Sequence, residues 1–122
     1  IHIEGTRSPD GRLYKGHTGV AKLALETGCP IVPVAIIGSD TLQPVGTVVP
    51  KKGKTQVIYG APIPVERKDA EDVTHDDLRA LTDQVTRAIQ SMSGQEYVDE
   101  YAQTVKKRLK EQAAQAAQAA SK

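Results

Sequence analysis

The pattern of apolar and polar positions predicts a strand, a helix and a second strand in the first third of the chain. Residues 1–3 alternate as a strand does and continue directly into a Glu-Gly-Thr-Arg loop. Apolar residues then recur at helical spacing over residues 18–27, and the Gly-Cys-Pro that follows is a helix stop signal. Residues 31–38 are almost wholly apolar, which is typical of a strand buried on both faces of a parallel sheet.

A strand, a helix and a buried strand in this order predict a βαβ unit. Its crossover is expected to be right-handed, and a ligand is expected beyond the carboxyl end of the first strand, where residues 5–15 lie. Residues 39–53 are rich in Pro, Gly and Val and predict a long loop, and residues 54–60 predict a third short strand. The predicted fold class is α/β, with a partial parallel or mixed sheet followed by C-terminal helices.

The second half of the chain predicts two helices. Thr74 is a suitable N-cap for a helix whose apolar residues share one face and which ends at Gly94. A last helix is expected from Gln95. Its Ala- and Gln-rich end, residues 112–122, predicts a frayed helix or a disordered tail, because the alternative of a partner-binding helix lacks the usual Leu or Ile anchors.

Composition narrows the function classes. The 122 residues suffice for one domain with a modest core, at 39% hydrophobic content, and contain no apolar run of the roughly 18 residues that a bilayer span needs. The net charge is +1, but Lys and Arg outnumber Asp and Glu in residues 1–60, so this half is the better place for an anion site. Four Tyr with no Phe or Trp make nucleic acid a minor alternative. The single Cys29 is expected to be buried in a reducing compartment, without a disulfide or a metal.

The loop after the first predicted strand has the chemistry of an anion site. Arg7 offers a planar fork suited to phosphate, glycines let the backbone approach closely, and hydroxyls and a helix N-terminus supply further donors. Glu4 would hold Arg7 in position or accept a hydrogen bond from a ligand hydroxyl. An alternative of equal weight is a Ser-Pro-Asp-Gly turn with a surface Arg–Glu pair.

The histidines do not predict a catalytic base. None of His2, His17 and His75 is followed by Asp five positions later, and none lies beside a Ser or Cys in a nucleophile setting. His17 could touch a ligand, although a capping or exposed role is favoured, and His75 is expected to be structural. No catalytic residue is assigned.

Two stretches of the chain resemble a known family. "IEGTRSPDGRLYKGHTGVAKLAL" followed by "CPIVPVAIIGSD" resembles the third and fourth sequence blocks of the PlsC-like glycerolipid acyltransferases, which make phosphatidate from lysophosphatidate. In that family the third block reads Phe-Pro-Glu-Gly-Thr-Arg-Ser, and the fourth is an apolar strand with a Pro. The resemblance covers residues 1 to about 65, with His2 and Ile3 in place of the usual aromatic residue and Pro.

The resemblance implies an acceptor site. Arg7 would contact the phosphate of the glycerol-phosphate head, its neighbours would complete the site, and a Pro would shape the acyl-donor or acceptor pocket. The implied substrate-binding residues are Glu4, Gly5, Thr6, Arg7, Ser8, Lys15 and Pro33. Family members transfer an acyl chain from acyl-CoA or acyl carrier protein to lysophosphatidate, peripherally at the cytoplasmic face of a membrane, with no metal, no other cofactor and no nucleic acid.

The family's catalytic His-x4-Asp block and a second Arg-bearing block are not found here. Both are expected upstream, so the chain is expected to be the C-terminal part of an acyltransferase: residues 1–65 the end of its domain, 66–111 a helical segment and 112–122 the tail. Alone it is predicted to be inactive and poorly stable. The alternatives are a non-enzymatic domain that binds phosphate or anionic lipid, and a nucleotide-binding domain, for which no phosphate-loop motif is present.

Overall fold

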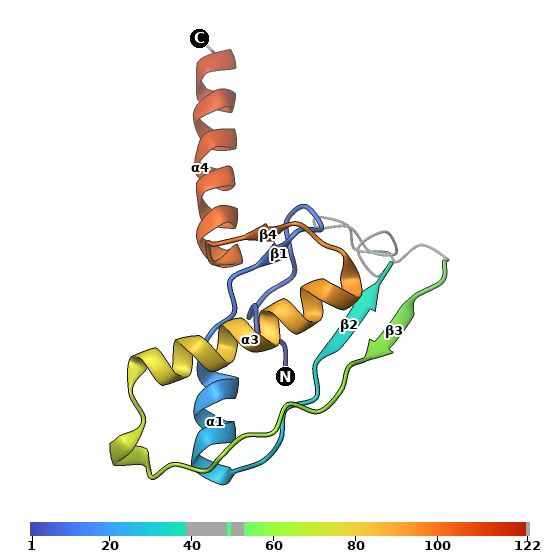
Figure 1. The fold of residues 1–122 in the computed structure, drawn as a ribbon. Coiled ribbons are helices and arrows are strands. Elements are labelled where there is room, and N and C mark those ends of the chain that lie inside the picture. The colour runs from blue at the N-terminus through green and yellow to red at the C-terminus, as the bar shows by residue number, and fades with distance from the viewer. Residues whose placement is uncertain (39–48, 50–52, 122) are drawn as a thin grey trace.

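The computed structural model describes residues 1–38, 49 and 53–121. Helices and short strands are interspersed along the chain, and α4 extends away from the body formed by the other elements (Figure 1). The elements are β1 (Leu13–Tyr14), α1 (Gly19–Thr27), β2 (Val34–Ile37), β3 (Gln56–Tyr59), the 3₁₀ helix η1 (Ala70–Asp72), α3 (His75–Ser93), β4 (Tyr97–Val98) and α4 (Ala102–Ala120).

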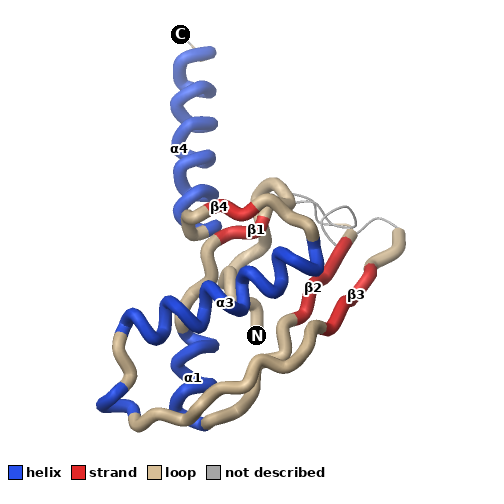
Figure 2. Tube along the Cα trace, viewed as in Figure 1, coloured by secondary structure: helices blue, strands red, loops and turns tan. Residues whose placement is uncertain are grey.

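The strands form two separate pairs (Figure 2). β1 pairs with β4 in parallel, and β2 pairs with β3 antiparallel, with Val34 opposite Tyr59. A bridge between Ile31 and Ile63 continues the second pair beyond the hairpin strands. The α/β class with mixed strand pairing is therefore confirmed, and the strand predicted within residues 54–60 is β3.

The first predicted strand is wrong. Residues 1–3 are not a strand; instead the chain turns, with the Gly5 N–H donating to the His2 carbonyl at 3.3 Å and the His17 N–H to the Ile3 carbonyl at 2.7 Å. Gly5 has φ +74°, a conformation that turns the chain where a strand would continue. The predicted βαβ pairing is consequently absent from the described strands, where β2 takes β3 as its neighbour.

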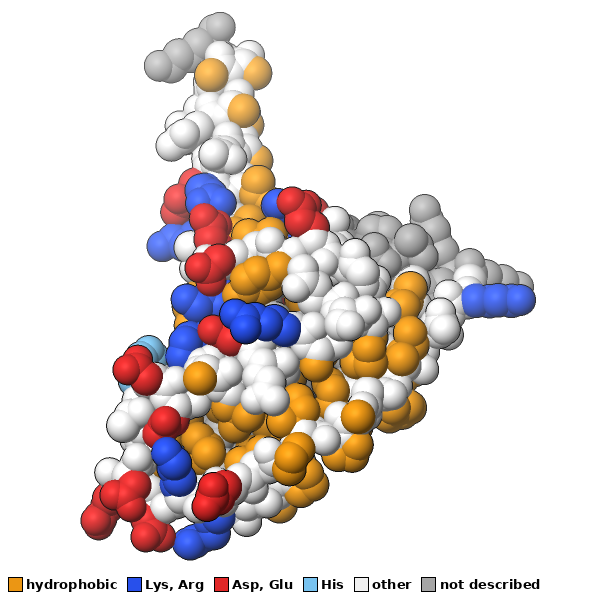
Figure 3. Space-filling model, in the orientation of Figure 1, with side chains coloured by type: hydrophobic (Ala, Val, Ile, Leu, Met, Phe, Trp, Pro, Cys, Tyr) orange, Lys and Arg blue, Asp and Glu red, His pale blue; other side chains and the backbone are white. Residues whose placement is uncertain are grey.

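Two clusters of buried side chains hold these elements together. The larger joins α1, the Ile31–Ile63 bridge and α3 through Ala24 and Val85, and the smaller packs Tyr14 of β1 against the first turns of α4. One face of the β2–β3 hairpin stays open: Ile36 and Val57, paired across the strands, are 45% and 47% exposed. β2 is thus not buried on both faces as predicted, and apolar side chains gather over this hairpin in Figure 3.

The helix boundaries follow local signals except at α4. α1 matches its prediction and ends at Gly28, where φ is +75°. The helix expected from Gln95 begins only at Ala102, because β4 occupies part of the interval. α4 then continues to Ala120 through the stretch expected to be frayed or disordered, consistent with the high helix propensity of Ala and Gln.

Three further predictions meet different outcomes. Cys29 is exposed, not buried, because it lies in the loop that leaves the left-handed end of α1. The loop predicted over residues 39–53 lies almost wholly outside the described residues. No helix in the described part of the chain is long and apolar enough to cross a membrane.

Thr74→Ala is expected to destabilise the fold through α3. The Thr74 hydroxyl accepts from the Asp77 N–H at 3.2 Å, and the Asp77 carboxylate accepts from the Thr74 N–H at 3.1 Å, which is a complete capping box. Losing it should lower the free energy of unfolding by about 1 kcal/mol in a denaturant titration. Thr74→Ser keeps the acceptor oxygen and should behave as wild type; equal stability of both variants and wild type would contradict the prediction.

Candidate functional site

The motif loop, residues 4–8, is shaped by a tight turn at Gly5. Besides its positive φ, this glycine lies against the ring of His17: an added Cβ would be 3.2 Å from His17 Cδ2. Both the backbone conformation and the close approach require glycine here. The loop is therefore held against the residues that precede α1.

Glu4 points toward β1. Its Oε1 accepts the Tyr14 N–H at 2.8 Å. Burial raises the pKa of Glu4, and the Tyr14 hydrogen bond and the charges of His2 and Lys106 oppose this effect only in part. Among the described residues Glu4 makes no ion pair with Arg7, so the expected Glu4–Arg7 pairing is not formed and Glu4 instead anchors the loop to β1.

The Ser-Pro-Asp-Gly turn of the alternative interpretation is also present. Ser8 Oγ donates to the Arg12 carbonyl at 2.7 Å, while Asp10 Oδ2 accepts from Arg12 Nε and from the Tyr14 hydroxyl, both at 2.8 Å. Burial alone would raise the pKa of Asp10, but the hydrogen bonds from Arg12 and Tyr14 outweigh it and lower this pKa to about 2. The charge of Arg12 is thereby paired, and Ser8 holds the turn.

Three cationic side chains lie in or near the motif loop. Arg7 is exposed, and in the described part of the chain its guanidinium has no hydrogen-bond or ion-pair partner. Lys15 Nζ lies 5.3 Å from the centroid of the Tyr101 ring and 3.9 Å from Asp99 Oδ1. Lys106 Nζ donates to Thr6 Oγ1 at 2.8 Å. The arrangement can hold an anion, and of the three cations only Arg7 has neither a hydrogen-bond nor an ion-pair partner among the described residues.

The start of α4 completes this site, which sequence reasoning missed. The Tyr101 ring stacks on His17 with centroids 4.5 Å apart and 10° between the planes, and a Cβ on Gly5 would lie 3.7 Å from Gln103 Nε2. His17 is thus stacked on Tyr101, not capping a helix. Residues this far apart in sequence carry no shared motif, so no signal in one sequence brings Tyr101 and Lys106 to the loop.

Pro33 is placed apart from the other predicted site residues. It is buried before β2, and its carbonyl accepts the Gly60 N–H at 2.8 Å. A Cβ on Gly60 would lie only 2.8 Å from Pro33 Cγ, so the two residues pack closely. The structure therefore brings the motif loop and Lys15 together and leaves Pro33 with the hairpin.

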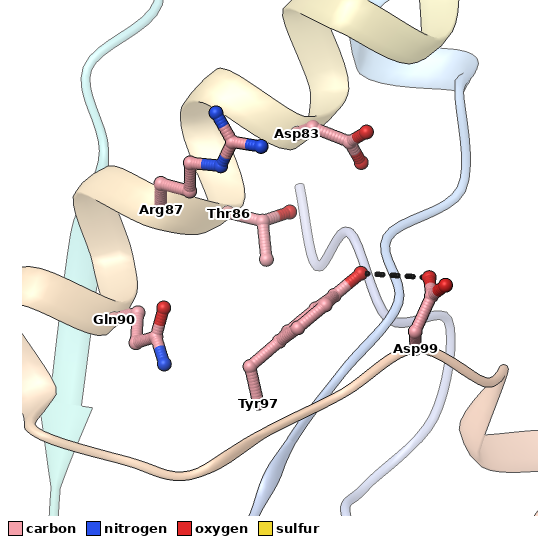
Figure 4. Close-up of a pocket in the computed structure, with 6 residues that line it drawn as sticks. All are labelled: Asp83, Thr86, Arg87, Gln90, Tyr97 and Asp99. Atoms are coloured by element: carbon pink, nitrogen blue, oxygen red, sulfur yellow. Dashed lines mark hydrogen bonds between the residues drawn. The ribbon is translucent and has the colours of Figure 1, made fainter.

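A pocket of about 300 Å³ lies between α3 and the segment formed by β4 and the residue after it (Figure 4). The side chains of α3 face Tyr97, whose hydroxyl donates to Asp99 Oδ1 at 3.3 Å. The pocket is lined by Asp83, Thr86, Arg87, Gln90, Tyr97 and Asp99. Because two of the lining side chains are carboxylates, this pocket is less suitable for an anion than the motif loop. One of them, Asp99, forms the ion pair with Lys15 described above.

Comparison with known proteins agrees on one family. Residues 1–37 match the family model described as Acyltransferase. The chloroplastic 1-acyl-sn-glycerol-3-phosphate acyltransferase BAT2 of Brassica napus is 39% identical over 61 residues, and the chloroplastic LPAT1 of Arabidopsis thaliana is 36% identical over 67 residues. These alignments cover 49% and 54% of this chain.

The similarity extends to three dimensions. The crystal structure of the 1-acyl-sn-glycerophosphate acyltransferase PlsC of Thermotoga maritima matches with a TM-score of 0.54 and 29% identity, over 74% of this chain and 36% of that one. The chain spans only 18% and 19% of the length of the two plant relatives. Residues 1–37, which match the family model, include the motif loop, Lys15 and α1.

Substitutions of Glu4 are expected to separate its hydrogen bond from its charge. Glu4→Ala leaves the buried Tyr14 N–H without its acceptor and should lower the free energy of unfolding by about 1–3 kcal/mol. Glu4→Gln keeps an acceptor oxygen and removes the charge that burial disfavours. The free energy of unfolding of Glu4→Gln at pH 7 should be at least that of wild type. Glu66→Gln, at an exposed position, is the control for loss of a carboxylate charge on the surface.

The pH dependence provides a second check. Because the pKa of Glu4 is raised on folding, the folded state binds this proton more tightly, so stability falls as pH rises from the ordinary value of 4.5 through the folded pKa. The Glu4→Gln variant should lack that component of the wild-type profile. Identical profiles of wild type and Glu4→Gln, measured by denaturation across this range, would show that the raised pKa is wrong.

Proposed function

We propose that the chain is part of a PlsC-like 1-acyl-sn-glycerol-3-phosphate acyltransferase, and that its motif loop binds the phosphate of lysophosphatidate. In this function the chain contributes the acceptor site for acyl transfer from acyl-CoA or acyl carrier protein, which yields phosphatidate. The names of the plant relatives and of the bacterial structure support this substrate class.

The observation that carries the proposal is the guanidinium of Arg7, which has no hydrogen-bond or ion-pair partner among the residues that the structure describes. Of the two arginines near the loop, Arg12 is held by Asp10, whereas Arg7 is exposed beside Thr6 and Gly5. A guanidinium can give two parallel N–H donors to a phosphate, and Gly5, which is exposed, brings no side chain of its own to the loop beside Arg7. Lys15 and Thr6 are the proposed neighbours of the same anion, whereas Glu4 acts on the ligand indirectly by anchoring the loop.

Acyl transfer needs more than this site. The acceptor hydroxyl attacks the thioester carbonyl, the thiol leaves, and a base must take the hydroxyl proton. The resemblance assigns that role to a His-x4-Asp pair, which the sequence of this chain does not contain. We therefore propose that this chain binds and orients the acceptor, at the cytoplasmic face of a membrane where such a lipid lies, and that it does not by itself complete the reaction.

Arg7→Ala is expected to weaken binding of the phosphate-bearing acceptor. Isothermal titration of the 122-residue chain with glycerol 3-phosphate should show at least about tenfold lower affinity, because a hydrogen bond to a charged group is lost. Arg67→Ala is the matched control, since this exposed arginine lies beside Gly28 at the other end of α1. Equal affinity of Arg7→Ala and wild type would overturn the assignment of Arg7.

The second expectation concerns turnover. The purified chain mixed with lysophosphatidate and acyl-CoA should form no phosphatidate above a heat-denatured control, because no base is assigned in its sequence. Product would be followed by mass spectrometry. Enzyme-dependent phosphatidate formation that is lost on heating would contradict the division of roles proposed here.

A further inference from the structure

We propose that Lys106 of α4 is a second phosphate-binding cation, which acts with Arg7 on the same phosphomonoester. The inference rests on the proposed function of the motif loop and extends it to a helix that lies outside the 37 residues matched by the family model. The acceptor site would then be built from two segments 100 positions apart in the chain.

The position of the Lys106 ammonium supports this role. Nζ lies 2.8 Å from Thr6 Oγ1, on the residue directly before Arg7. An ammonium has three N–H donors, and the hydrogen bond to Thr6 uses one of them. Two donors therefore remain at the loop for an anion that also contacts Arg7.

The packing of α4 keeps this ammonium at the loop. Ala102 and Val105 are 0% and 5% exposed and pack against Tyr14, and the ring of Tyr101 is stacked on His17. Lys106 directly follows this buried contact and is itself half-buried. A binding group held on a packed helix turn loses little freedom when the ligand arrives.

A purely structural role explains the positive charge of Lys106 less well than phosphate binding does. Glu4 is the carboxylate that feels the charge of Lys106, but its Oε1 already accepts the Tyr14 N–H, and among the described residues Lys106 forms no ion pair. Holding Thr6 alone requires a donor, not a cation. The Lys106 ammonium brings a positive charge to Thr6, the residue directly before Arg7 in the chain, and a phosphate is an anion that both cations could bind.

The first experiment compares affinities for glycerol 3-phosphate, measured by isothermal titration of the 122-residue chain. Lys106→Met keeps the aliphatic stem and should bind about tenfold more weakly, with a reduced salt dependence because one cation is lost. Lys106→Arg should retain most of the affinity. Lys107→Met, on the exposed neighbour in α4, should bind as wild type.

A denaturant titration guards against a folding artefact. Lys106→Met and the milder Lys106→Gln should unfold at a midpoint close to that of wild type, and both should bind weakly. A merely structural lysine would instead shift the midpoint and leave the salt dependence of binding unchanged, which would overturn the inference.

The source of the phosphate is tested with vesicles. Phosphatidylcholine vesicles with and without lysophosphatidate distinguish a lipid headgroup from the free phosphomonoester, and a loss in Lys106→Met confined to one of the two probes identifies that source. Wild-type binding that is unchanged in Lys106→Met for both probes would overturn only the role of Lys106. Failure of wild type to bind either probe would overturn the proposed function together with it.

Discussion

The buried position of Tyr14 is the constraint on which the candidate site depends. Its side chain is 0% exposed, its N–H is held by Glu4, and its hydroxyl donates to Asp10. A buried hydroxyl or N–H without a partner destabilises the folded state. Tyr14 therefore joins the motif loop, through Glu4, to the Ser-Pro-Asp-Gly turn, through Asp10. Its ring also packs against the first turns of α4, so one residue joins the motif loop, the turn and a helix from the other end of the chain.

This connection explains why residues from distant segments meet at the loop. The parallel pairing of β1 with β4 places the start of α4 next to the segment that follows the motif loop. The stacking of Tyr101 on His17 is a second contact between the same two parts of the chain. Together they restrict where Lys106 can lie, so the charge around Thr6 is a consequence of packing rather than of the motif itself.

The parts of the structure that sequence predicts are those set by neighbours in the chain. The end of α1 at Gly28 and the cap of α3 at Thr74 depend on residues within one helical turn, and both are confirmed. The strand predicted at residues 1–3 is not formed, because the turn at Gly5 outweighs the short apolar–polar alternation of these three residues. β4 and the contacts of Lys106 depend on pairing across most of the chain, which local periodicity does not encode. The residue types of the motif loop predicted it as an anion site, whereas the residues at the start of α4 that contact the loop were not predicted.

The two arginines of the loop region show how the same side chain takes two roles. Hydrogen bonds from Arg12 and Tyr14 hold the pKa of Asp10 at about 2, against the effect of its burial, so Asp10 stays ionised at neutral pH and keeps the Arg12 charge paired. Because this pKa is lowered on folding, the stabilisation is present above the ordinary value of 3.8 and is lost only as pH falls through about 2. Arg12 therefore stabilises the turn over the whole physiological range. Arg7 has no such partner among the described residues, and its charge stays available to a ligand.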